Sequence, residues 1–134
     1  MELITFKMIV DIGISLFNVT KSLNGKEKRK SMGKWMHDLG ILVEDISIKL
    51  EQNEFPHAAC AKMSYMVDHF QDMMTGQLDD KELSDINEML IQAKNIERLY
   101  GELGQLTPEE RAEKIVALKE IAGTLQGAGD MMTR

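Results

Sequence analysis

Residues 27–52, EKRKSMGKWMHDLGILVEDISIKLEQ, decide the fold of this chain. Within this stretch, apolar side chains recur at alternating steps of four and three residues, which is the spacing of one face of an α-helix. A seam of this kind indicates a helix that packs nearly parallel to its neighbours. The seam consists of Met32, Met36, Leu39, Val43, Ile46 and Leu50, with Trp35 beside Met36.

Two glycines interrupt the same helix. Gly33 and Gly40 are seven residues apart, so they share one side of it. Either they allow another helix to approach closely, or they only weaken the helix by about 1 kcal/mol each.

Residues 3–23 form a second helical candidate with an unusually wide apolar arc. Its polar residues Lys7, Asp11, Ser15, Asn18 and Ser22 fall on one narrow stripe. A helix of this kind is central in a bundle, provides a face for self-association, or anchors the protein at a membrane surface.

Three further helices are predicted downstream, at about 56–74, 80–103 and 108–126. Asp79 or Asp80 is the expected N-cap of the second of these. Thr107-Pro108-Glu109-Glu110 has the pattern of a capping box with proline at the first helical position. Residues 127–134 are expected to form a flexible tail.

The short connections predict an all-α, up-and-down helical bundle of about five helices, forming one domain over residues 1–126. A length of 134 residues suits a single core. The lone cysteine, Cys60, excludes an internal disulfide, so a cytoplasmic location is expected. The longest uncharged N-terminal stretch, residues 12–20, is too short to cross a bilayer, because a spanning helix needs about 20 residues.

The formal net charge is −6 and is distributed unevenly. Residues 1–34 carry seven basic and three acidic side chains, whereas residues 35–134 carry nine basic and nineteen acidic ones. This acidic remainder argues against general nucleic-acid binding, which needs clustered cations. The candidate residues for binding an anionic surface are Lys26, Lys28, Arg29, Lys30 and Lys34, although such a run is more often a solvated helix start.

No catalytic constellation and no cofactor are predicted, so the chain is expected not to be an enzyme. His57 lies three residues before Cys60 on one helix face, but this cysteine is better explained as a small core residue. Asp68, His69 and Asp72 could hold an adventitious metal ion on a surface turn, and no physiological metal is expected there.

The leading hypothesis is therefore a helical module that binds a protein partner or itself, as an adaptor or regulator. The alternatives are a small acidic inhibitor or ligand-sequestering protein, and a peripheral membrane module that uses the N-terminal helix and the basic residues. The residues predicted to bind a partner are Phe6, Ile9, Phe17, Met32 and Trp35.

One segment also resembles known proteins. Residues 28–70 combine a basic start at Lys28-Arg29-Lys30, the aliphatic seam, and Phe55-Pro56-His57 followed by Cys60. In these features they resemble a helical accessory segment found beside signalling or defence domains in bacterial, particularly cyanobacterial, proteins. The resemblance implies a bacterial adaptor-like module and assigns no site residues.

Overall fold

The computed structural model describes residues 3–21 and 23–134, and this part of the chain contains six α-helices and no β-strand. The all-α class is thus confirmed. In chain order the helices are α1 (Ile4–Thr20), α2 (Lys26–Glu51), α3 (His57–Met74), α4 (Asp80–Ala93), α5 (Ile96–Gly104) and α6 (Pro108–Thr133).

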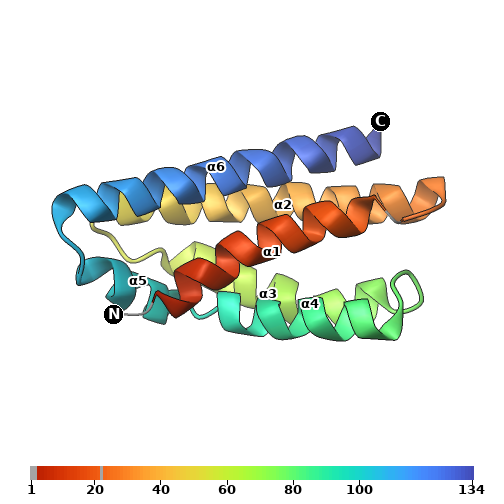
Figure 1. Ribbon diagram of the computed structural model, residues 1–134, viewed down its shortest axis with the longest axis horizontal. Helices are drawn as coiled ribbons and strands as arrows, with labels where there is room; N and C mark the ends of the chain where they lie inside the picture. Colours follow the sequence, from red (N-terminus) through yellow and green to blue (C-terminus); the bar gives the residue numbers. More distant parts are fainter. Residues whose placement is uncertain (1–2, 22) are drawn as a thin grey trace.

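Five of the helices form a closed ring of contacts around the core. α2 packs on α6 and on α3, α3 packs on α4, and α1 joins α4 back to α6. Figure 1 shows α2 and α6 running side by side along one edge of the molecule, with α1 crossing obliquely in front and the short α5 at one end. The broad apolar arc of α1 faces the core inside this ring, where Ile9, Ile12, Leu16 and Val19 are buried.

The seam on α2 forms the centre of the core, as the sequence predicts. All six seam residues are at most 1% exposed. Trp35 packs against Phe70 of α3, with ring centroids 4.8 Å apart. Tilted aromatic pairs at this distance add to the stabilisation from apolar burial.

The two glycines of α2 allow close helix approach. A Cβ atom on Gly33 would lie 2.7 Å from the carbonyl oxygen of Gly129, and one on Gly40 would lie 2.8 Å from that of Ala122. Both distances are shorter than van der Waals contact, so no larger residue fits without moving the backbone. Gly129 is seven residues after Ala122, which is the same spacing as between Gly33 and Gly40. The small residues of α6 therefore lie opposite the glycines of α2 at both positions.

The end of the chain differs from the sequence prediction. Residues 127–134 were expected to be a flexible tail, but α6 continues to Thr133. The reason is packing: Gly129 lies against Gly33 and His37 of α2, and Met132 is buried. These contacts offset the low helix propensity of the glycines in this segment.

The predicted helix at 80–103 is two helices, α4 and α5. The break falls at Lys94 and Asn95, where the Asn95 side chain accepts a hydrogen bond from the Arg98 backbone N–H at 3.1 Å. Asn95 is thus an N-cap. Asp79 caps α4 in the same way, and the predicted capping box of Thr107 and Glu110 is present with both hydrogen bonds at 3.2 Å. Hydrogen bonding to Thr107 also lowers the pKa of Glu110.

A buried carboxylate from α5 caps the start of α1. Glu102 is 8% exposed, and its two oxygens accept hydrogen bonds from the backbone N–H groups of Thr5 at 2.9 Å and Phe6 at 3.1 Å. Arg98, one turn earlier on α5, donates from Nε to the Thr5 hydroxyl. Because α1 has no side-chain N-cap of its own, this long-range contact satisfies two of its orphan donors.

The first prediction compares a glycine of α2 that contacts α6 with a glycine of α6 that faces open space. Gly40→Ala is expected to lower the free energy of unfolding by about 1–3 kcal/mol, because the added methyl overpacks the α2–α6 contact. Gly123→Ala is the matched control: it adds the same methyl in open space and should raise stability by about 0.5–1 kcal/mol. Urea unfolding followed by circular dichroism measures both. Equal effects of the two substitutions would contradict the proposed close contact.

The second prediction concerns the cap on α1. Glu102→Ala should lower the free energy of unfolding by about 1–3 kcal/mol, because it leaves two backbone donors without their charged acceptor. Glu113→Ala removes an exposed carboxylate from α6 and is expected to change stability by less than about 0.5 kcal/mol. The same unfolding measurement applies, and hydrogen exchange at Thr5 and Phe6 should accelerate only in the Glu102 variant.

Candidate functional site

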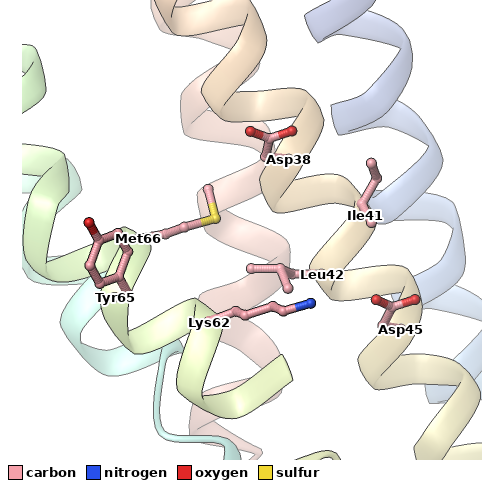
Figure 2. Close-up of a pocket in the computed structure, with 7 residues that line it drawn as sticks. All are labelled: Asp38, Ile41, Leu42, Asp45, Lys62, Tyr65 and Met66. Carbon is pink, nitrogen blue, oxygen red and sulfur yellow. The ribbon is translucent and has the colours of Figure 1, made fainter. Parts of the chain in front are cut away.

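An open, largely apolar groove lies between α2 and α3. Its volume is about 330 Å³. Figure 2 shows its lining, which comes from one face of each helix: Asp38, Ile41, Leu42 and Asp45 of α2, and Lys62, Tyr65 and Met66 of α3.

Four of the seven residues that line the groove are apolar or aromatic, and they occupy its floor and part of its lips. Leu42 is buried and Met66 is half-buried, and Figure 2 shows their side chains directed toward one another across the gap. Ile41 is 41% exposed and Tyr65 is 66% exposed. Because large apolar side chains at the lips continue into an apolar floor, the groove offers a contiguous surface suited to a partner.

Charged groups line the α2 rim of the groove. Asp38 and Asp45 are seven residues apart on one helix face, which separates them by about 10 Å along the axis. Neither carboxylate forms an ion pair among the described residues. Across the groove, the amino group of Lys62 extends toward the Asp45 side in Figure 2.

The structure does not bring the predicted partner-binding residues together at one surface. Ile9, Met32 and Trp35 are 2%, 0% and 6% exposed and belong to the core, so in this fold they cannot contact a partner directly. Phe6 is half-buried beneath the Lys114 amino group, which lies 5.4 Å from its ring centroid. Only Phe17 is exposed, and Lys21 lies over its ring at 5.1 Å.

The cause of this difference is visible in the helix geometry. Met32 belongs to the inward seam and Trp35 lies beside it, so both turn to the core. The exposed apolar residues of α2, Ile41 and Ile48, are seven apart and lie outside the seam. That spacing was the available sequence signal for a second apolar stripe on α2.

The five basic residues do not form one uniform patch. Lys28 and Arg29 reach backbone carbonyl oxygens, of Gly76 at 3.5 Å and of Thr20 at 3.1 Å. Lys26 is exposed. Lys30 and Lys34 line a separate hollow of about 520 Å³ at the end of α6, together with Ser31, His37, Asp38, Asp130 and Thr133. His37 Nδ1 lies 2.9 Å from an Asp130 carboxylate oxygen there. The acidic groups of this hollow therefore reduce the net positive charge of Lys30 and Lys34.

Two of the three candidate metal ligands contact other groups of the protein. Asp68 accepts from the Lys94 amino group at 2.9 Å. The His69 ring stacks on Tyr65 with centroids 4.1 Å apart, and its Nδ1 lies 2.9 Å from the Tyr65 carbonyl oxygen. Asp72 is exposed. Residues 3–21 and 23–134 contain no group of three or more histidine, cysteine or acidic side chains placed to hold a metal ion.

Cys60 has no sign of activation as a nucleophile. Burial, and to a smaller extent the negative charge of Glu97, raises the pKa of its thiol, which disfavours the reactive thiolate. The neighbouring His57 ring packs on Phe55, with centroids 4.7 Å apart.

The comparisons with known proteins identify no relative. No family model, curated protein or solved structure matches the chain. Among the described helices, none is long and apolar enough to cross a membrane. The function proposed below therefore rests on the geometry of the α2–α3 groove.

The third prediction tests the placement of Trp35, the single tryptophan of the chain. Its fluorescence should show the short-wavelength emission of an apolar environment and weak quenching by acrylamide, because the indole is buried against Phe70. Trp35→Ala should lower the free energy of unfolding by about 3–5 kcal/mol. Emission and quenching equal to those of free tryptophan would contradict the core position.

Proposed function

We propose that this protein is a non-enzymatic helical interaction module, an adaptor or regulator that binds an α-helix of a partner protein in the α2–α3 groove. An up-and-down bundle with the added helix α5 is the scaffold in this proposal. The role of the scaffold is to hold α2 and α3 apart at a fixed spacing, so that their facing side chains receive the partner.

The observation that supports the proposal most strongly is the apolar continuity of the groove. Exposed Ile41 and Tyr65 stand above a floor made by Leu42 and Met66. A groove of this kind suits the apolar face of an amphipathic helix, whose anchor residues recur at steps of three and four. Methionine adapts its shape easily, so Met66 can adjust to different anchors.

Charge argues for a different protein rather than a second copy of this chain. A two-fold dimer built on the groove would bring the same patch of both copies together. Such a contact would bring together four carboxylates, from Asp38 and Asp45 of both copies, and only two Lys62 amino groups, and this excess of like charge opposes association. A foreign helix carries no such constraint.

The fourth prediction uses peptides as probes. A displayed library of amphipathic helices, varied on the polar face, would be selected against the intact protein, and the selected peptides would be measured by fluorescence anisotropy. Tyr65→Ala and Ile41→Ala should each raise Kd about tenfold, because aromatic and large apolar anchors dominate binding energy. Val116→Ala, which truncates an exposed apolar residue on α6, is the control and should leave Kd unchanged.

Two outcomes would contradict the proposal. One is a library selection that yields no helix with measurable affinity. The other is a set of peptides whose Kd responds equally to Tyr65→Ala and Val116→Ala. Unfolding curves of each variant show whether the fold is intact, which is expected because all three side chains are exposed.

A further inference from the structure

We infer that the helix bound in the α2–α3 groove is cationic, with two Lys or Arg residues seven positions apart that pair with Asp38 and Asp45. This inference rests on the proposed function and specifies its partner class. It depends on three features of the groove: the spacing of the two carboxylates, their lack of partners, and the position of Lys62.

The spacing matches a second helix directly. Asp38 and Asp45 repeat after seven residues, or nearly two helical turns. A helix lying nearly parallel or antiparallel to α2 has the same rise per residue, so its own residues at positions i and i+7 meet both carboxylates. The residues between them, at i+3 and i+4, then face the floor made by Leu42 and Met66.

Both carboxylates are available. Elsewhere the structure pairs acidic side chains with lysines: Asp68 with Lys94 at 2.9 Å, Glu54 with Lys49 at 3.1 Å, and Glu51 with Lys119 at 2.9 Å. Asp38 and Asp45 have no such partner within the described residues. An unpaired carboxylate beside an apolar floor favours the approach of an opposite charge.

Lys62 makes the two ends of the groove unequal. Its amino group extends toward the Asp45 side of the groove, so it screens Asp45 more than Asp38. Asp38 has other cationic neighbours, because it also lines the hollow that contains Lys30 and Lys34. Lys62 also disfavours a cation on the α3 side of the bound helix, which requires a neutral or acidic residue there.

The net negative charge of the whole chain also favours a cationic partner. Residues 35–134, which contain most of the fold, carry nineteen acidic and nine basic side chains. Such an excess attracts a cationic helix before contact and speeds association at low ionic strength. Binding is therefore expected to weaken as salt is added.

The experiment uses three synthetic helical peptides that share one apolar face. The first carries lysines at i and i+7 on the edge that meets α2, the second carries glutamines at those positions, and the third carries the same lysines on its solvent-facing side. Anisotropy titrations with the intact protein at about 20 mM and about 300 mM salt measure each Kd. The expected result is that the first peptide binds about threefold to fivefold tighter than the other two at low salt.

Variants of the protein then show which carboxylates are responsible for the tighter binding of the first peptide. Asp38→Asn and Asp45→Asn should each reduce the advantage of the first peptide, because each removes one of the two carboxylates that its lysines meet. Glu113→Gln on α6 removes one negative charge far from the groove and is the matched control. It should not change the ratio of the Kd values of the lysine peptide and the glutamine peptide. Asp38→Lys should reverse the preference, so that a peptide with glutamate at the matching position becomes the tighter ligand.

Three outcomes would contradict the inference. If the lysine and glutamine peptides bind with equal Kd while Tyr65→Ala still weakens both, the inference fails and the proposed function stands. If no peptide binds, both fail. If the protein alone sediments as a dimer that Asp38→Asn disrupts, the cationic partner is a second copy of this chain and the inferred partner is overturned.

Discussion

The contact between the backbones of α2 and α6 sets the geometry on which the other features depend. Gly33 and Gly40 leave no room for a side chain between the helices, so α2 has a fixed rotation about its own axis. Leu42 is two residues from Gly40 and therefore lies about 200° around the helix, nearly opposite the glycine contact. The same contact that joins α2 to α6 thus turns the groove residues toward α3.

A second long-range contact, between Glu102 and the start of α1, joins α5 to the ring. α1 has no capping side chain before it, and its first free N–H groups would be unsatisfied in the interior without the Glu102 carboxylate. Through Glu102 and Arg98, α5 connects the segment before α6 to the first helix of the chain. This nine-residue helix therefore caps α1 in addition to burying Ile96, Leu99 and Leu103 in the core.

Local patterns in the sequence predicted most of the fold. The seam from Met32 to Leu50 and the Thr107 capping box depend on near neighbours, so periodicity and cap chemistry were sufficient. The last turn of α6 was not predicted, because its stability comes from Gly129 packing on a residue ninety-six positions away. The split at Asn95 was missed because an apolar stripe continues through it, although asparagine is a common N-cap.

The site was harder to predict for a related reason. Periodicity shows which residues share a face, but it does not show whether that face meets the core, a partner or solvent. Met32 and Trp35 satisfied the expected chemistry of a binding surface, yet Phe70 of α3 covers Trp35. Ile41 and Tyr65 come from two helices, and only the packing of α2 on α3 places them together.

The charges on the α2 rim would oppose closure of the groove between α2 and α3. If α3 moved closer to α2, Leu42 and Met66 would gain apolar contact, but Asp38 and Asp45 would lose water. Removing a carboxylate from water costs several kcal/mol unless a good partner replaces the hydration. Lys62 is the only cation in the groove lining and cannot serve two carboxylates about 10 Å apart. The charges therefore oppose collapse of the apolar floor, and a ligand that brings two matched cations together with an apolar face satisfies both demands at once.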